Sequence, residues 1–330
     1  MQVIDIHSDI ITHIVSFREK GENQVLDRYH YKRLKAAGIT CLIMVLWVEG
    51  EKQNSAFERF IQLLGAFQAD LQESSRFRLI KDINDLTDRQ DGKISIILGL
   101  EGLRFMEQWP VAGLDEEERI NQIIAFLNSL YIRHAILCWN EINKISSGTG
   151  AKQASPLGLS SFGKKVIKRL EKEKYIIDLS HLDQTSFWDV IQETSKPVIC
   201  SHSNARALCD HPRNLTDEQI KIIGARGGLI GINAIPEFVD PANPSLERFI
   251  DHIDYIANLI GIEHVAFGFD FVDYLETFKH DLEDRKTVGL ESAICVPKLL
   301  KHLQKRGYLK EEIETMASGN FLRLVKQIWS

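Results

Sequence analysis

The sequence has few cysteines and fewer basic than acidic residues, and each of these features argues against a class of protein. Its five cysteines are odd in number and form no CxxC pair, which argues against a disulfide framework and favours a reduced chain. The 40 Lys and Arg residues are outnumbered by 46 Asp and Glu, so the formal net charge is -6, and no long basic run is present. Binding to nucleic acid through broad phosphate contacts is therefore disfavoured.

Long hydrophobic runs are also missing. No window approaches the roughly 18 uninterrupted apolar residues of a membrane-spanning helix. The opening MQVIDIHSDI has acids and a histidine where an export signal needs a basic and then an apolar segment. The final GNFLRLVKQIWS lacks the hydrophobic tail of a lipid-anchor signal. These absences predict a cytoplasmic protein that binds neither membrane nor nucleic acid.

No repeat, low-complexity tract or Pro/Gly-rich linker divides the 330 residues. The length would suit two domains, but a single α/β barrel also reaches it. We expect one domain over residues 1–330, with a helical C-terminal extension over 291–330 that packs on the barrel.

Short runs rich in Val, Ile and Leu alternate with helical patterns, which is typical of a parallel sheet wound with helices. Eight such runs occur, at Val3–Asp9, Thr40–Val48, Ile94–Glu101, Ala135–Asn140, Tyr175–His181, Pro197–His202, Gly228–Asn233 and His264–Asp270. Because eight parallel strands close a barrel, the predicted fold class is α/β, a (β/α)8 TIM-like barrel. One helix should begin at a capping box formed by Thr216 and Gln219 and should stop at Gly227. Three long connections follow strands, over 141–159, 234–244 and 271–290, and such loops form the active-site face of a barrel.

The predicted strands repeatedly end in a histidine or a carboxylate. These residues are His7, Asp9, Glu101, His181, His202 and Asp270. At one mouth of a barrel these groups would repel one another or stay desolvated without a cation, whereas imidazole nitrogen and carboxylate oxygen are good zinc ligands. Any one of them alone is more often a surface or capping group, so the prediction depends on their joint placement.

The number of ligands predicts two zinc ions per chain. We expect His7 and Asp9 on the first ion, His181 and His202 on the second, and Glu101 bridging both. Each ion then keeps an open position for water, as catalytic zinc does. Two such ions would share a hydroxide that is nucleophilic near neutral pH, so the predicted chemistry is hydrolysis.

Other ionisable residues near these positions carry weaker signals. Asp5 shares the face of His7 and is a candidate to support the metal ligands. No role is predicted for the other histidines, which are His13, His30, His134, His211, His252, His264, His280 and His302.

The chain resembles the membrane (renal) dipeptidase family of zinc peptidases, peptidase family M19. The motifs that carry the resemblance are HSD at 7–9, GLEG at 99–102, IDLSH at 177–181, SHSNARAL at 201–208 and HPRNLTDEQI at 211–220. The likeness extends from the first strand to the closing GNFLRLV. It implies a (β/α)8 barrel of the metal-dependent hydrolase type, zinc on the five ligands named above, hydrolysis of dipeptides, and a possible homodimer.

The resemblance also implies roles for three further positions. Arg213, in HPRN, resembles the arginine that holds the free carboxylate of the substrate. Asp270, in GFDF, resembles the aspartate near the substrate amine and the leaving nitrogen, and we expect it and Glu101 to be catalytic. Trp139 stands where animal members have a histidine thought to aid the oxyanion, and an indole is a weaker, donor-only substitute at this substrate-binding position.

Two other functions remain open from the sequence. A related binuclear zinc barrel hydrolase that acts on another amide, a lactam or an ester would use the same metals without a carboxylate clamp. A catalytically silent binding protein would keep the metal site for stability alone.

Overall fold

The computed structural model describes residues 1–330 except 49–54, 88–91, 112, 152–157 and 276–285. Within these residues, nine parallel strands form one sheet. They are β1 (Val3–Ser8), β2 (Ile39–Trp47), β3 (Phe77–Leu79), β4 (Ile94–Glu101), β5 (Ile132–Ile136), β6 (Ile176–Asp178), β7 (Ile199–Cys200), β8 (Leu229–Ile232) and β9 (Val265–Phe267). The sheet closes into an eight-stranded barrel because β2 pairs with both β1 and β4, while β3 lies along the start of β4.

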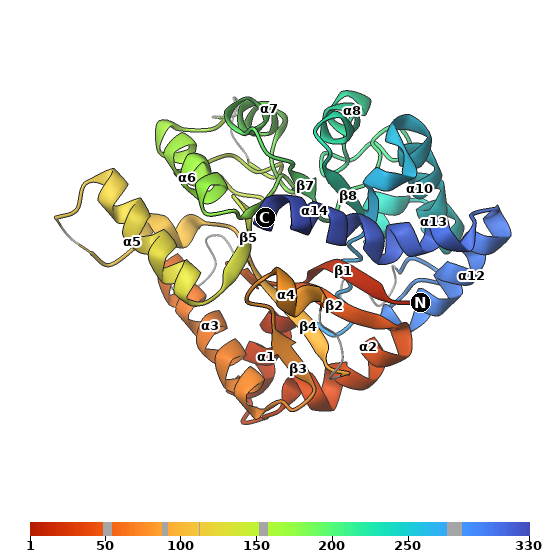
Figure 1. The fold of residues 1–330 in the computed structure, drawn as a ribbon, viewed down its shortest axis with the longest axis horizontal. Coiled ribbons are helices and arrows are strands. Elements are labelled where there is room, and N and C mark those ends of the chain that lie inside the picture. The colour runs from red at the N-terminus through yellow and green to blue at the C-terminus, as the bar shows by residue number, and fades with distance from the viewer. Residues whose placement is uncertain (49–54, 88–91, 112, 152–157, 276–285) are drawn as a thin grey trace.

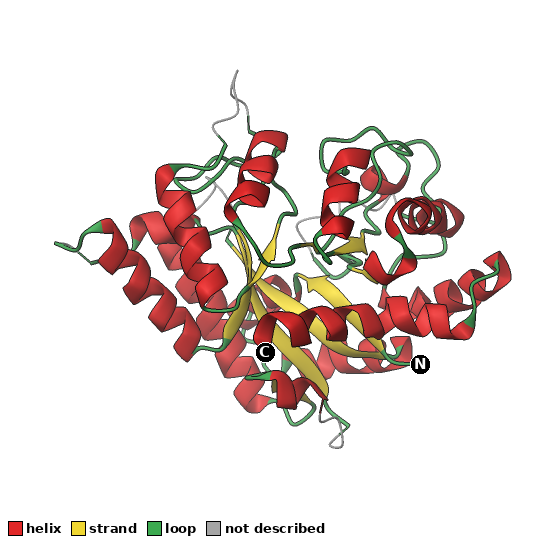
Figure 2. Ribbon diagram, turned by 45° about the horizontal axis from the view of Figure 1, so that its top comes forward, coloured by secondary structure: helices red, strands yellow, loops and turns green. Residues whose placement is uncertain are grey.

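Helices connect the strands and surround the barrel (Figures 1 and 2). They are α1 (Ile10–Glu19), α2 (Tyr31–Ala37), α3 (Ala56–Glu73), α4 (Ile83–Thr87), α5 (Glu116–Ser129), α6 (Ser161–Lys172), α7 (Gln184–Glu193), α8 (Asp217–Ala225), α9 (Pro236–Val239), α10 (Leu246–Ile260), α12 (Val296–Arg306), α13 (Lys310–Glu314) and α14 (Asn320–Trp329). The capping box predicted for α8 is present, since the Thr216 side chain accepts from the Gln219 backbone and the Gln219 side chain accepts from Thr216. Gly227 follows that helix with a φ of +70°.

The predicted barrel is confirmed, although most of its strands are shorter than the sequence suggests. The fourth predicted strand, Ala135–Asn140, was placed too late, because β5 spans Ile132–Ile136. Its start contains Arg133 and His134, whose polarity hides the strand from an apolar pattern. Strand β3 was not predicted, since it has only three residues.

The structure describes one of the three predicted long connections completely and the other two only in part. The connection 234–244 contains the short helix α9. Residues 152–157 and 276–285, within the other two connections, lie outside the described residues, and His280 lies there too.

The buried apolar side chains form two layers, one between strands and helices and one inside the barrel. In the inner layer, Ile4 of β1 and Ala266 of β9 cluster with Phe321 and Leu324 of α14. Helix α14 crosses the middle of the view in Figure 1 and covers the end at which the strands begin. Residues 291–330 are largely helical. The opposite end of the barrel, where the strands finish, is left for polar side chains.

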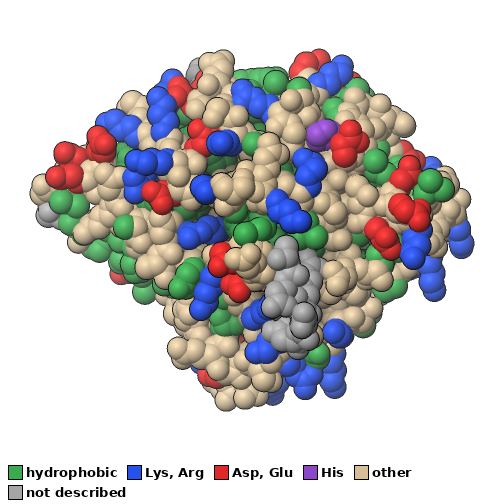
Figure 3. Space-filling view, viewed as in Figure 1, with side chains coloured by type: hydrophobic (Ala, Val, Ile, Leu, Met, Phe, Trp, Pro, Cys, Tyr) green, Lys and Arg blue, Asp and Glu red, His purple; other side chains and the backbone are tan. Residues whose placement is uncertain are grey.

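The surface carries both signs of charge. On the face seen in Figure 3, basic and acidic side chains are interspersed rather than gathered into one large basic area. Among the described residues, no helix combines the length and apolarity needed to cross a bilayer.

Candidate active site

The side chains singled out in the sequence gather at the end of the barrel where the strands finish. His7 lies in β1 and Glu101 is the last residue of β4. The others directly follow strands or lie in the loops after them, and they are Asp9, Trp139, His181, His202, Arg213 and Asp270. The first strand was expected to include Asp9, but β1 ends at Ser8, and Asp9 is the residue that precedes α1.

Glu101 lies between three histidines. Its Oε1 atom is 2.9 Å from Nε2 of His181 and 3.7 Å from Nε2 of His202. Its Oε2 atom is 3.8 Å from Nε2 of His7. The two carboxylate oxygens thus face different histidines, as a bridging ligand requires.

His7 also faces two other carboxylates. Its Nε2 atom lies 3.6 Å from Oδ2 of Asp9 and 3.8 Å from Oδ1 of Asp270. Among the described residues, ligand atoms of His7 lie close enough to hold an ion together with Glu101 and His202, and also with Asp9 and Asp270. The second group includes Asp270, which the sequence analysis assigned to the substrate rather than to the metal.

Burial dominates the electrostatics of this cluster. Desolvation raises the pKa of Glu101 well above its usual value. Burial, together with Arg213 and His7, lowers the pKa values of His181 and His202 well below theirs. Burial opposes protonation of His7, but Glu101 and Asp9 raise its pKa to about 10. Desolvated groups of this kind are costly unless a charge of opposite sign pairs with them.

The donor set fits a metal. The Nδ1 atom of His181 lies 2.9 Å from Oδ1 of Asn140, and that of His202 lies 2.8 Å from Oγ of Ser201. Such outer partners fix the ring of a ligating histidine and leave its Nε2 atom for the ion. Oδ1 of Asp9 has no hydrogen-bond partner within the described part of the chain. Imidazole and carboxylate donors with free atoms facing one point are the ligand type that zinc takes.

Arg213 is buried close to this cluster, and no acidic side chain in the described ranges forms an ion pair with it. The residue is 6% exposed, and its Nη2 atom makes only a long hydrogen bond of 3.5 Å to the carbonyl oxygen of His202. Its Nε atom has no partner among the residues that the structure describes. Burial lowers the pKa of Arg213, and Asp270 and Glu101 oppose this effect. A guanidinium in this state can receive an external carboxylate.

Trp139 lines the side of the site next to His181. Its ring centroid is 6.1 Å from that of His181 and 5.3 Å from that of Trp47. The indole is therefore a wall of the site, which is compatible with the predicted substrate contact.

Two site residues have backbone conformations that non-glycine residues seldom adopt. His181 has a φ of +73° and Asp270 a φ of +57°. Left-handed conformations of this kind persist only where the surroundings enforce them, and they are often found at functional sites. The carboxylate of Asp270 is also held, because Nδ2 of Asn233 donates to its Oδ2 atom at 3.0 Å. Burial raises the pKa of Asp270 to about 7.

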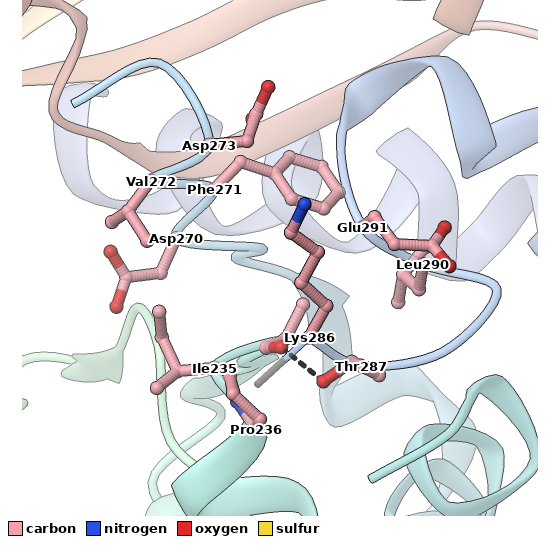
Figure 4. A pocket seen from close by; sticks show the side chains of 11 residues that line it. Ile235, Pro236, Asp270, Phe271, Val272, Asp273, Lys286, Thr287, Leu290 and Glu291 are labelled. Carbon is pink, nitrogen blue, oxygen red and sulfur yellow. Dashed lines mark hydrogen bonds between the residues drawn. The ribbon is translucent and has the colours of Figure 1, made fainter. Parts of the chain in front are cut away.

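A cavity of about 40 Å³ opens beside Asp270. Figure 4 shows the Asp270 carboxylate on one side of it, with Ile235 and Val272 nearby and Lys286 reaching in from across. The site therefore continues into a small space with both apolar and charged walls.

The model of one protein family, the membrane dipeptidases (peptidase family M19), matches residues 1–330. The chain belongs to this family. The resemblance seen in the sequence is thereby confirmed, and membership of this family identifies the chain as a metallo-dipeptidase, a hydrolase.

Individual relatives agree with this family assignment. An uncharacterized protein from the pqqA 5′ region of Klebsiella pneumoniae is 32% identical over 268 residues, which cover 78% of this chain and 90% of that protein. The dipeptidase aclJ of Aspergillus oryzae is 29% identical over 252 residues, which cover 76% of this chain but 55% of that protein. A metallopeptidase from Rhodobacter sphaeroides, solved with a phosphinate mimic of the dipeptide L-Ala-D-Ala, has the same fold, with a TM-score of 0.83 at 19% identity and coverage of 100% and 99%.

Several residues at the site were missed by the sequence analysis. Asn140 contacts His181, and Asn233 contacts Asp270. Both residues end predicted strands, so the rule that selected histidines and acids at strand ends would have found them if it had included amides. Ser201 contacts His202 and could have been proposed as its neighbour in sequence.

Proposed function

We propose that this chain hydrolyses the peptide bond of dipeptides with two zinc ions held where the barrel strands finish. The observation that carries the proposal is the position of Glu101, whose two oxygens face His7 on one side and His181 and His202 on the other. Membership of the membrane dipeptidase family supports the same function.

Five residues would hold the two ions. His7 and Asp9 would hold one, His181 and His202 the other, and Glu101 would contribute one oxygen to each. Bound zinc supplies Lewis acidity and makes water a nucleophile near neutral pH. Burial and the lowered pKa values of His181 and His202 keep these imidazoles in the neutral form that binds metal.

Asp270 would move the proton that the reaction needs. Its buried carboxyl group has a pKa raised to about 7, so it can both accept a proton and give one up near neutral pH. Asn233 fixes the direction of the carboxylate through the hydrogen bond to Oδ2. In this role Asp270 delivers a proton to the amine nitrogen that departs when the peptide bond breaks.

Arg213 would bind the free carboxylate of the dipeptide. Its planar guanidinium offers two parallel donors, which match the two oxygens of a carboxylate. The buried guanidinium, whose Nε atom has no hydrogen-bond partner among the described residues, supports the assignment, because a substrate carboxylate would supply that partner. Trp139 would form the neighbouring wall beside His181.

The test is a panel of dipeptides, matched C-terminally amidated dipeptides and tripeptides. Each substrate is assayed with zinc, after removal of zinc by a chelator, and after zinc is restored. We expect the free dipeptides alone to be cut well, and only when zinc is present. Equal turnover of the amidated series would instead favour a hydrolase of other amides, lactams or esters. No metal-dependent turnover of any substrate would favour a silent binding protein.

Three expectations stay predictions. The single domain over 1–330 and the homodimer are two of them. The cytoplasmic location is the third, and its support is that all five cysteines are free thiols.

A further inference from the structure

Asp178 is a fully buried carboxylate behind the candidate metal site that none of the proposed roles uses. It is the last residue of β6, and its side chain is 0% exposed. Its Oδ1 atom accepts from the backbone N–H groups of Ser180, at 2.9 Å, and Ser201, at 3.0 Å. Its Oδ2 atom lies 2.8 Å from Nε2 of His134, which is also fully buried.

The two backbone groups that Asp178 binds belong to different strand ends. Ser180 follows β6 and directly precedes His181, whereas Ser201 follows β7 and directly precedes His202. The bond to Ser180 closes a short turn of the kind that aspartate forms with the backbone two residues ahead. This turn leads straight into His181 and its left-handed φ of +73°.

Ser201 and Ser180 also form hydrogen bonds with His202. Oγ of Ser201 lies 2.8 Å from Nδ1 of His202, and Oγ of Ser180 accepts from the backbone N–H of His202 at 3.2 Å. One carboxylate therefore holds the backbones from which both histidines project.

The surroundings leave this arrangement little room to move. Ser201 packs against two glycines, because a Cβ atom at Gly231 or Gly268 would lie 1.9 or 1.6 Å from its carbonyl oxygen. A Cβ atom at Gly99 would lie 2.5 Å from Nδ1 of His134. The close approach of these backbones is possible only at glycine, so both the support behind Asp178 and the segment in front of it are tightly packed.

We propose that Asp178, supported by His134, is a positioning residue that sets the separation and orientation of His181 and His202. The inference rests on the proposed function, in which these two histidines hold a metal. Without Asp178, the ends of β6 and β7 would no longer share an acceptor, and the two Nε2 atoms would not be held at the 2.9 Å separation observed here. Outer partners of this kind affect metal affinity by about 10-fold to 100-fold.

The chain offers a matched control in Asp70 of α3. Its side chain is likewise 0% exposed, and it accepts from the backbone N–H groups of Val25 and Leu26 and from the guanidinium of Arg18. Asp70 thus contacts two backbone N–H groups and one basic side chain, as Asp178 does, but the basic side chain is an arginine and none of the partners belongs to the site. Its replacement reports what the loss of a buried carboxylate does to stability alone.

The experiment compares Asp178→Ala, Asp178→Asn, Asp70→Ala and the unchanged chain. Zinc affinity and stoichiometry are measured by competition with a chelator on the folded proteins, and the cobalt(II) forms are compared by absorption spectroscopy. We expect Asp178→Ala to weaken one of two zinc sites by about 10-fold to 100-fold and to alter the cobalt spectrum. The amide oxygen of Asp178→Asn can still accept from both backbone groups, so this variant should recover part of the affinity.

The outcomes are distinct. Both alanine variants should lower the unfolding temperature, but Asp70→Ala should keep the zinc affinities and cobalt spectrum of the unchanged chain. If Asp178→Ala behaves in the same way as Asp70→Ala, Asp178 is only structural and the inference is overturned. If Asp178→Ala does not fold, Asp178→Ser decides, because its shorter hydroxyl cannot reach both backbone N–H groups, and unaltered affinity and spectrum in that variant would also overturn the inference. Failure of the unchanged chain to bind two zinc ions would instead contradict the proposed function.

Discussion

The Nε2 atoms of His181 and His202 lie 2.9 Å apart, although each imidazole has its other nitrogen bonded elsewhere. The acceptor at His181 is Oδ1 of Asn140, so Nδ1 of His181 must donate and its Nε2 atom carries a lone pair. Such a contact is satisfied either by an Nε2–H group of His202 that donates to His181 or by a cation that binds both lone pairs. The proposed zinc ion is the second case, in which Nδ1 of His202 donates to Ser201 and its Nε2 atom faces the metal.

Glu101→Ala should therefore lose both zinc ions. Its two oxygens are the connection between the His7 side and the His181 side of the cluster. Removing them leaves each site with two protein ligands, fewer than the three that catalytic zinc usually has. Elemental analysis of the purified protein should show about two zinc ions before the change and fewer than one after it.

A useful control for that measurement is Glu141→Ala, in the loop after β5. Glu141 lies near the same end of the barrel, and burial raises its pKa, but it is not one of the proposed ligands. It should keep both ions. A single ion with full activity in the unchanged chain would contradict a bridging role for Glu101.

Asp270→Asn should retain zinc but lose at least about 100-fold in kcat, the low end for removal of a general acid or base. The five other ligands complete both proposed sites, and the amide preserves the shape of the carboxylate without its proton chemistry. Zinc content and kcat are measured on the same preparation. Loss of one zinc ion would make Asp270 a ligand, which its 3.8 Å distance from His7 allows. Normal turnover would remove Asp270 from the mechanism.

The barrel could be predicted well because buried parallel strands consist of consecutive apolar residues, which can be recognised in the sequence without tertiary information. The sequence also indicated which polar side chains gather at one end of the barrel, because the ends of parallel strands meet there. The exact strand ends were less accessible, as β5 shows, since Arg133 and His134 interrupt its apolar pattern.

The outer partners of the site could not be inferred from the pattern alone. Asp178 and His134 are separated by 44 residues, and only the pairing of β5 with β6 brings them together. Asp5 was expected to support the metal ligands, and the structure shows that it accepts from the backbone N–H groups of His7 and Phe269 rather than from a ring. Such bonds depend on local backbone geometry, which the sequence does not display.

Leu324→Ala should destabilise the barrel without changing its chemistry. Leu324 is 0% exposed in α14 and belongs to the apolar cluster that fills the barrel interior at the end away from the site. A buried leucine replaced by alanine costs about 2–5 kcal/mol of unfolding free energy, because a cavity remains. Denaturant unfolding should show this loss, while zinc content and kcat below the unfolding transition stay normal. An equally large fall in kcat would contradict the separation of the two barrel ends.

Arg213→Ala should weaken the hydrolysis of dipeptides strongly and leave amidated dipeptides nearly unchanged. Removing one partner of a desolvated charge pair costs about 2–5 kcal/mol, which at about 1.36 kcal/mol per factor of ten is roughly 30-fold to several thousandfold in kcat/KM. An additional C-terminal residue moves the carboxylate about 3.3–3.6 Å beyond the guanidinium, so tripeptides should be poor substrates of the unchanged chain. Arg206→Ala is the matched control, because the guanidinium of Arg206 donates to the carbonyl oxygens of His211 and Pro212 and so supports the same loop. If that loop alone matters, Arg206→Ala and Arg213→Ala will both lower kcat/KM equally for free and amidated substrates at unaltered zinc content. If only Arg213→Ala lowers kcat/KM selectively for free dipeptides, the guanidinium binds the substrate carboxylate.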